Sequence, residues 1–236
     1  MPTFQGQVIL IGLNVLAIFR KFSFGKGWFP KLATIESKPD APTMDLTEVS
    51  RERLQTDHLW TAEDLLDFQN SPWQHELIHG VLYRMPPTGD EHGYLAGNFF
   101  GWLFQHVKTN QLGELFAAET GYVVQTNPDS VIAPDCSFIS KNRWSTDQLS
   151  GKYLRTSPDL VAEVVSPNDR PREVQEKVER WLQFGVRAVV VIDPKSQTVT
   201  VNSPSQQKIL YGPDDTMDLN FVVPGFTLPI HRIFQG

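Results

Sequence analysis

A short apolar run with one acid inside it constrains this chain more than any other feature. Residues 160–165 read LVAEVV, and Glu163 is the only charged residue among them. The run has the length and the β-branched content of a buried strand, where a carboxylate is costly unless it is paired or bound to a metal. Residues 171–184 follow with helical spacing, with Pro171 at the start and Gly185 after the end. We therefore predict a buried strand that carries an acid and leads directly into a helix.

Composition and charge bound the class of protein. The 236 residues suffice for one domain of ordinary size, or for a domain with an appendage, and 40% hydrophobic with 20% charged content fits a soluble globular chain. The net charge of -6 argues against a large positive field for nucleic acid, although a local basic groove is compatible with it. The single cysteine, Cys136, excludes an intrachain disulfide and a zinc site of the CxxC type. We therefore expect a reducing, cytoplasmic environment.

The first part of the chain is predicted to lie outside the domain. Residues 7–19 (QVILIGLNVLAIF) are apolar but shorter than the ~20 residues that a membrane-spanning helix needs, and positive charges follow the run rather than preceding it. Residues 36–57 are polar and contain proline, which is typical of a linker. We predict an apolar extension and a polar linker with little fixed structure over residues 1–57, with Met44 as an alternative start, and a single domain over residues 58–236. A weak membrane association of the N-terminal run is the alternative.

Hydrophobic periodicity and turn residues predict a mixed domain of helices and strands. Thr61 and Asp64 form a capping pattern for a short helix, and apolar residues recur at helical spacing over residues 91–107. Short runs of strand-forming residues are separated by turn residues such as Asn127-Pro128-Asp129. The predicted strands are residues 115–118, 122–125, 131–139, 160–165, 188–192, 198–201, 209–211 and 219–223. This order indicates an α/β or α+β fold with a central mixed β-sheet flanked by helices.

Two of these strands carry an acid. Asp135 lies within the run Ala133–Phe138, and Glu163 lies within the strand described first. Two carboxylates from neighbouring strands can hold one Mg²⁺ through oxygen while the ion keeps several waters. Such an ion can activate a water molecule and neutralise charge that develops on a phosphate. Taken singly, each acid has an ordinary interpretation, as a turn residue for Asp135 and as a partner of an arginine for Glu163.

A lysine on the following helix is the third member of this candidate site. On a helix over residues 171–184, Lys177 lies three residues after Val174 and four before Trp181, so it borders the apolar stripe of the helix. From that edge, its ammonium group could reach over the sheet to stabilise an oxyanion or to orient a water. Taken alone, Lys177 would be a surface lysine whose stem lies along apolar surface. Convergence of all three side chains is what would distinguish a site.

These residues also resemble a known family. Pro134-Asp135, the run PDLVAEVVSP at residues 158–167, Glu176-Lys177 and Trp181 together resemble the Uma2 family, also called DUF820, which is abundant in cyanobacteria. Further similar segments are Glu76-Leu77-Ile78-His79-Gly80, Pro86-Pro87 with His92, Gly185-Val186-Arg187, Asp193-Pro194 and Pro224-Gly225-Phe226. The resemblance extends from about Trp60 to Phe234. No single motif is specific; their order and spacing together are.

The resemblance implies a restriction endonuclease with the PD-(D/E)XK nuclease fold. It implies that Asp135 and Glu163 are metal ligands, that Mg²⁺ or another divalent ion such as Mn²⁺ is the cofactor, and that DNA is the substrate. Cleavage of both strands would favour a homodimer with two sites. The lysine expected two residues after Glu163 is replaced by Val165, and the resemblance implies that Lys177 supplies it from the helix. Glu76 matches an acid that can join the metal site in this fold.

Glu76 also belongs to a competing motif. His75-Glu76-Leu77-Ile78-His79 fits H-E-x-x-H, in which two histidines on one side of a helix bind zinc and the glutamate acts as general base. Against a helix, Gly80 follows the second histidine at once and strand-forming residues come next. We expect a β-hairpin over residues 76–85 that turns at His79-Gly80, with both histidines on the face of Leu77. A zinc metalloprotease is the alternative.

The sequence therefore leaves three functions open. The first is a Mg²⁺-dependent endonuclease that uses Asp135, Glu163, Lys177 and Glu76. The second is a catalytically inactive member of the fold that binds nucleic acid or protein. The third is the zinc metalloprotease. His92 matches a recurring position of the family, to which the resemblance assigns no role.

Overall fold

The computed structural model describes residues 51–54, 57–204 and 208–235. All of them belong to the compact unit Met44–Gly236. The predictions for the apolar run and for most of the linker lie outside the described residues. Within the described part, no helix is long and apolar enough to cross a bilayer.

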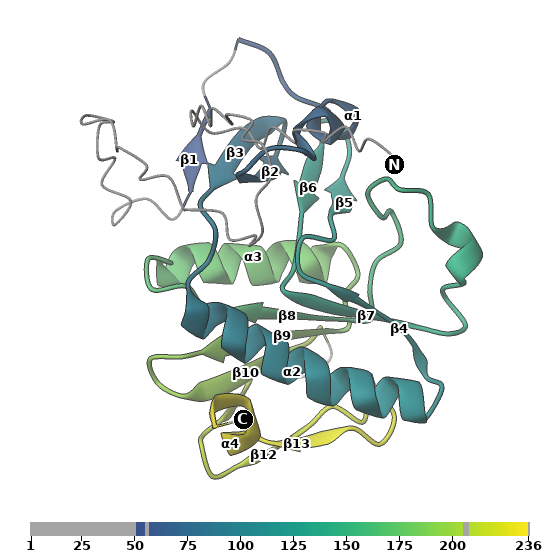
Figure 1. Cartoon of the computed structure of the whole chain (residues 1–236), viewed down its shortest axis with the longest axis vertical. Helices are drawn as coiled ribbons and strands as arrows, with labels where there is room; N and C mark the ends of the chain where they lie inside the picture. The colour runs from purple at the N-terminus through teal and green to yellow at the C-terminus, as the bar shows by residue number, and fades with distance from the viewer. Residues whose placement is uncertain (1–50, 55–56, 205–207, 236) are drawn as a thin grey trace, which may run out of the picture. The chain divides into compact units, whose positions relative to one another are not determined.

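A six-stranded sheet forms the centre of the domain (Figure 1). Its strands, in spatial order, are β11 (Ile209–Tyr211), β10 (Thr198–Asn202), β9 (Ala188–Asp193), β8 (Leu160–Val164), β7 (Cys136–Ser140) and β4 (Gly113–Ala117). Only β8 and β9 run parallel, and all other neighbours are antiparallel. The connection between the two parallel strands is the helix α3 (Pro171–Gln183), as a parallel pair requires a crossover. The prediction of a mixed sheet flanked by helices is confirmed.

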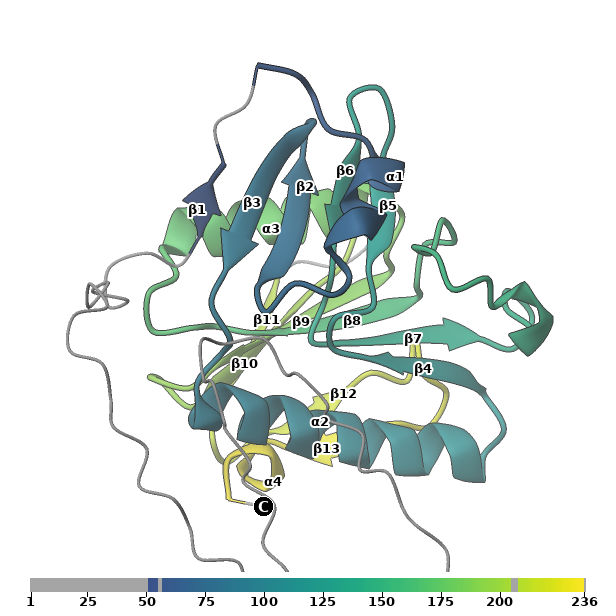
Figure 2. The same cartoon turned by 45° about the horizontal axis from the view of Figure 1, so that its top comes forward.

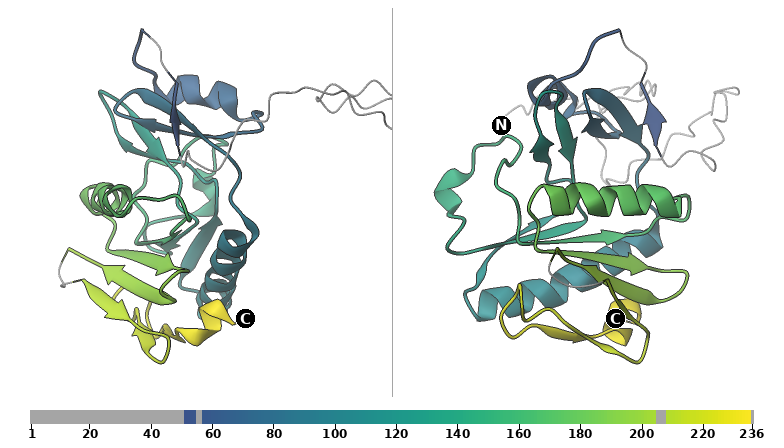
Figure 3. Two further views of the ribbon diagram at one scale, coloured as in Figure 1. Left: turned by 90° about the vertical axis from the view of Figure 1, so that its left-hand side faces the viewer. Right: turned by 180° about the vertical axis from the view of Figure 1, so that it is seen from behind.

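Helices cover the two faces of this sheet (Figure 3). The long helix α2 (Asp90–Thr109) lies on one face, where Phe99 and Leu103 share a core with Ala162 and Val190. On the opposite face, α3 buries Val178 and Trp181 against residues such as Val161 and Val189. Because side chains alternate along a strand, even-numbered residues of β8 face α2 and odd-numbered ones face α3. Glu163 therefore lies on the α3 side.

A second sheet lies beside the first and includes the first three strands of the domain (Figure 2). Its antiparallel strands, in spatial order, are β1 (Glu52–Arg53), β3 (Val81–Met85), β2 (Gln74–Ile78), β6 (Ser130–Ile132) and β5 (Tyr122–Gln125). The short helices α1 (Ala62–Leu65) and η1 (Leu66–Phe68) pack on it through Leu65 and Phe68, respectively. The predicted cap is confirmed, since the Thr61 hydroxyl accepts from the Asp64 N–H and the Asp64 carboxylate accepts from the Thr61 N–H.

A two-stranded sheet and a short helix complete the domain at its C-terminal end. The strands β12 (Thr216–Asp218) and β13 (Thr227–Pro229) form a small sheet, and α4 (His231–Phe234) packs against α2. The strand predicted for residues 219–223 is wrong: this segment forms turns, with the Val222 and Val223 N–H groups both donating to the Leu219 carbonyl. Leu219, Val222 and Val223 are nevertheless buried in the α2 core. Their apolar character reflects burial, which by itself does not distinguish a strand from a turn.

Two other sequence predictions need correction. The single strand predicted for residues 131–139 is divided into β6 and β7, which belong to different sheets, and Ala133-Pro134-Asp135 links them. Pro134 lacks the N–H that a continuous ladder needs, so the chain leaves one sheet there and enters the other.

The linker predicted up to residue 57 also contains β1, which pairs with β3 and joins Glu52 to Arg84 by an ion pair of 2.6 Å. Short polar segments without periodicity give no strand signal, so this pairing was not predictable.

Candidate active site

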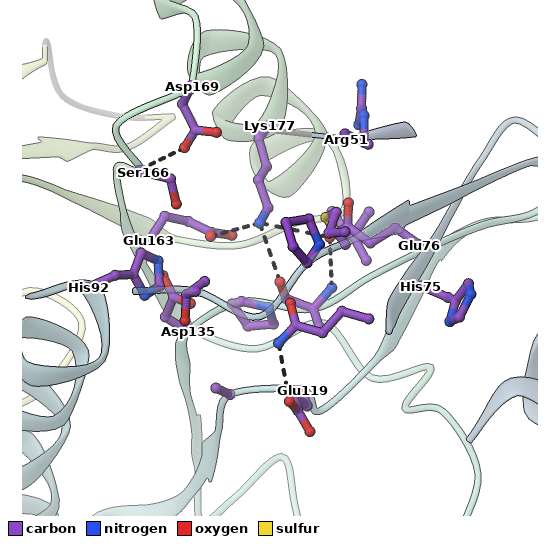
Figure 4. A pocket seen from close by; sticks show the side chains of 18 of the residues that line it. Arg51, His75, Glu76, His92, Glu119, Asp135, Glu163, Ser166, Asp169 and Lys177 are labelled. Carbon is purple, nitrogen blue, oxygen red and sulfur yellow. Dashed lines mark hydrogen bonds and ion pairs between the residues drawn. The ribbon is translucent and has the colours of Figure 1, made fainter. Parts of the chain in front are cut away.

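A cavity of about 530 Å³ lies where the two sheets meet. The residues that line it include Glu76 of β2, the link Ala133-Pro134-Asp135, and the end of β8 with the adjoining α3, together with residues 71–73 and 86–89 on either side of the β2–β3 hairpin. Figure 4 shows Glu76, Asp135, Glu163 and Lys177 pointing toward one another inside this cavity. The structure therefore brings all four sequence-predicted site residues together.

Glu163 is held by a hydrogen bond at each carboxylate oxygen. Its position on the α3 side of β8 directs the side chain toward that helix, where the Trp181 indole N–H donates to Oε1 at 2.7 Å. The Lys177 ammonium lies 2.8 Å from Oε2. Burial raises the pKa of Glu163 from its ordinary value of 4.5 to about 7, although the Lys177 charge works in the opposite direction. The carboxyl is therefore poised to change its charge near neutral pH.

Lys177 reaches the cavity from the edge of α3. Besides Glu163, its ammonium donates to the Ala133 carbonyl at 3.3 Å and lies 3.8 Å from Oε1 of Glu76. Burial disfavours its charge, but the surrounding carboxylates, with Glu163 foremost, outweigh this effect and raise the pKa of Lys177. The lysine stays protonated at neutral pH, and its side chain lines the cavity and is 30% exposed.

Asp135 lies next to Glu163 because of the strand register. Cys136 of β7 pairs with Ala162 of β8, and the Asp135 N–H donates to the Ala162 carbonyl at 3.1 Å, so the same register places Asp135 opposite Glu163. Side chains in such cross-strand pairs share one face, with Cβ atoms about 5 Å apart. The Val164 N–H donates to Asp135 Oδ2 at 2.7 Å. The two acids therefore sit side by side at the end of the sheet.

His92 supports Asp135 from the other helix. It lies in the first turn of α2, and its Nε2 is 3.3 Å from Asp135 Oδ2. Burial lowers the pKa of His92, but the hydrogen bond and the charge of Asp135 outweigh it and leave the pKa raised. Burial likewise raises the pKa of Asp135, yet His92 and Lys177 together hold it below its ordinary value. Asp135 is therefore ionised at neutral pH.

Glu76 approaches the group from the second sheet. It lies on β2, is 6% exposed, and its Oε1 accepts a long hydrogen bond of 3.4 Å from the Ala133 N–H. Its contact with Lys177 is also longer than a direct hydrogen bond. Glu76 thus contributes charge to the cavity from the side opposite β8, without direct contact to Asp135 or Glu163 among the interactions of the described residues.

Sequence reasoning missed the roles of Trp181 and His92. Trp181 was identified as part of the apolar stripe of α3 and of the family resemblance, without a role in the site, but its position four residues after Lys177 places both side chains on one face, where both donate to Glu163. No signal in the sequence paired His92 with Asp135, because the contact depends on how α2 packs across the sheet. Asp169, after β8, also lines the cavity and accepts from the Ser166 N–H at 2.8 Å.

Comparison with known proteins identifies the family and the fold of this chain. A family model named Uma2, described as "Putative restriction endonuclease", matches residues 62–231. The chain belongs to the Uma2 family. A solved structure described as "a putative nuclease belonging to DUF820" from Anabaena variabilis ATCC 29413 matches with a TM-score of 0.64 and 21% identity, over 74% of this chain and 97% of that one. At this identity the match establishes the fold. No curated protein matches the chain.

The chemistry of the acids in this Uma2 protein fits an oxygen-bound divalent ion. Among the described residues, no group of three or more His, Cys, Asp or Glu side chains has the arrangement to hold a metal by itself. Mg²⁺ does not need such a group, because it is bound through one or two carboxylates and takes its other ligands from water and substrate phosphates. The adjacent carboxylates of Asp135 and Glu163 match this requirement, and Mn²⁺ accepts the same donors.

The arrangement expected of a zinc protease is not formed. His75 lies in strand β2 and His79 in the turn with φ 50°, so the H-E-x-x-H motif is not on a helix. The predicted hairpin with its turn at His79-Gly80 is confirmed. The His75 ring lies tilted against Phe68 with ring centroids 4.8 Å apart, on the face of Leu77, whereas Glu76 points into the cavity (Figure 4). The zinc metalloprotease interpretation is therefore wrong, because the motif forms no helix and His75 and Glu76 point to opposite faces of the strand.

Proposed function

We propose that this protein hydrolyses phosphodiester bonds in DNA with the help of Mg²⁺ or Mn²⁺. The observation that carries the proposal is the convergence of Asp135, Glu163 and Lys177 in one cavity. They come from the β6–β7 link, from β8 and from α3, so no local sequence effect accounts for their meeting. Membership of the Uma2 family and the nuclease-like fold support the same reaction class.

The two acids are proposed to hold the metal. When bound there, the ion would activate water and neutralise charge on the phosphate. Asp135 is ionised at neutral pH, so it is ready to bind a cation. Glu163 holds its proton to a higher pH, and a bound cation would favour its ionised form. The Val164 N–H and His92 hold Asp135, while Trp181 holds Glu163, so both carboxylates are oriented before any ligand arrives.

Lys177 is proposed to support the attacking water and to stabilise the negative charge of the transition state. Its ammonium is charged and anchored at Glu163, and its side chain lines the cavity, which are the properties required of such a donor. The chain has Val165 two residues after Glu163, where the PD-(D/E)XK pattern has a lysine. The helix lysine fills the same chemical role from a different element. Glu76, on the opposite wall, is proposed to assist by keeping Lys177 charged.

The test is DNA cleavage by the full chain with Mg²⁺ or Mn²⁺ added. Replacing a metal ligand should remove several kcal/mol of transition-state stabilisation, so Asp135→Asn and Glu163→Gln should each lower the rate by about 10³-fold or more. Lys177→Met should lower it by about 10²–10³-fold. Glu179→Gln is the matched control, since Glu179 lies on α3 with its side chain exposed and should leave the rate unchanged.

Two results would reject this proposal. Metal-dependent cleavage that persists undiminished in both Asp135→Asn and Glu163→Gln would show that the site is elsewhere. Retention of DNA without cleavage under any divalent ion would favour a nucleic-acid-binding member of the fold that lacks activity. Circular dichroism of each variant would verify that a lost rate does not reflect lost folding.

A further inference from the structure

The outward side of α2 carries aromatic side chains that the domain leaves exposed. Phe99 is fully buried and marks the side of α2 that faces the sheet. On the other side, Tyr94 is 49% exposed and Phe104 is 43% exposed. α2 runs across the front of the domain in Figure 1, with the central sheet behind it. Aromatic side chains are enriched at protein–protein interfaces relative to the rest of the surface.

The glycines of the same helix side leave room for a close approach. Gly93, Gly97 and Gly101 are exposed, and a Cβ atom added at Gly97 or Gly101 would meet no heavy atom of the described residues within 4 Å. Packing within the described domain therefore does not require glycine at these positions. Glycine weakens a helix interior relative to alanine, and it permits another backbone to come close. Packing among the described residues therefore does not explain why these helix positions are glycine.

On the outward side of α2, similar or complementary residues occur at equal distances before and after position 99. Tyr94 and Phe104 lie five residues before and after Phe99, and Gly97 and Gly101 lie two residues before and after it. Asp90 and Lys108 lie nine residues before and after it. If a second copy of the helix packs antiparallel, Tyr94 therefore lies opposite the partner's Phe104. In the same way Gly97 lies opposite the partner's Gly101, and Asp90 lies opposite the partner's Lys108. This is the self-complementarity that a two-fold interface requires.

We propose that a second copy of this chain docks on α2, antiparallel, with the two-fold axis opposite Phe99. Charge complementarity selects a copy of the chain over an unrelated partner, because the helix begins with Asp90 and has Lys108 in its last turn. Within one chain Lys108 pairs with Glu114 and lies 5.8 Å from the Phe104 ring centroid, so its ammonium would be shared between Glu114 and the partner's Asp90. The proposal does not depend on the proposed hydrolysis.

The oligomeric state of the full chain tests this directly. Sedimentation equilibrium over a range of concentrations should show a monomer–dimer equilibrium. The double variant Gly97→Gln/Gly101→Gln should raise the dimer Kd by at least about tenfold, because side chains would fill the space between the helices. The same variant should not lower the Tm of dilute, monomeric protein, since both positions are open in the monomer and glutamine is the better helix former.

Charge reversal gives a second, independent readout. Asp90→Lys should weaken the dimer by placing two lysines together, and Asp90→Lys/Lys108→Asp should restore it by recreating both opposite pairs. Leu149→Gln is the control, because it removes an exposed apolar residue far from α2 in the sequence and should leave the Kd unchanged. A chain that stays monomeric at every concentration would overturn the proposal, and so would a dimer that the glycine and charge variants leave unaffected.

Discussion

At the scale of single residues, Glu163 shows how a buried acid is maintained in this fold. A carboxylate inside an apolar strand is tolerated because one oxygen accepts from an indole and the other from an ammonium. The Trp181 and Lys177 donors come from successive turns of one helix, so a single element satisfies both oxygens. Burial still raises the pKa of Glu163 to about 7 despite these two donors. A charged ligand in the cavity would therefore change the ionisation of Glu163 at neutral pH.

This pKa predicts a pH dependence of stability in metal-free protein. Between the ordinary value of 4.5 and about 7, the unfolded chain releases the Glu163 proton while the folded chain retains it. The free energy of unfolding should therefore fall as pH rises through this window. Urea denaturation at both ends of the window, with a chelator present, should show a smaller fall in Glu163→Gln than in wild type. Equal falls in the two proteins would contradict the assignment.

The indole donor offers a second prediction at this scale. Trp181→Phe keeps an aromatic ring but removes the N–H that Glu163 accepts, which should cost about 1–3 kcal/mol for the lost partner, in addition to the smaller ring. In a Glu163→Gln background the loss should be smaller, because a neutral amide depends less on the donor. A double-mutant cycle measured by urea denaturation isolates this coupling; a coupling energy of zero would show that the hydrogen bond is unimportant.

At the scale of elements, the site depends on three junctions. The β6–β7 link positions Asp135, the end of β8 positions Glu163, and α3 returns across the sheet to deliver Lys177. The end of α3 is set by Gly185, which has φ +96° directly after the C-cap residue Phe184. This left-handed conformation favours glycine and lets the chain turn back into β9.

Gly185→Ala should therefore destabilise the domain by about 1 kcal/mol. The cause is conformational, since an added Cβ would meet its nearest non-adjacent neighbour among the described residues, the Ser157 hydroxyl oxygen, only at 3.5 Å. Gly101→Ala in α2 is the matched control and should change stability in the opposite direction, by about 0.5–1 kcal/mol. Urea denaturation of dilute protein measures both; the same sign for the two variants would refute the argument.

At the scale of the whole molecule, the described core clusters contain no residue before position 54. The three clusters are built from α2 with the central sheet, from α3 with that sheet, and from α1 with the β2–β3 hairpin. A chain that begins at Met44 should therefore keep the Tm of the full chain within about 2 °C and retain any DNA cleavage. Differential scanning calorimetry and the cleavage assay test this. A lower Tm or lost activity would show that residues before Met44 contribute to the folded domain.

Local patterns in the sequence were sufficient for much of the fold. The α2 and α3 helices, the hairpin at His79-Gly80 and the strand with Glu163 follow from periodicity, caps and turn residues, which act between residues close in the chain. The division of residues 131–139 into two strands did not follow from local patterns, because an apolar run does not indicate which sheet each half joins.

The candidate site was predictable as a set of residue types, and only the tertiary structure decided its geometry. Asp135 and Glu163 are far apart in the chain, and they become neighbours because β7 and β8 pair in one particular register. His92 and Trp181 acquire their roles because α2 and α3 pack on the sheet so that each reaches one acid. Sequence by itself determined which side chains could bind a cation. Strand register and helix packing, which depend on contacts across the whole domain, determined that they meet.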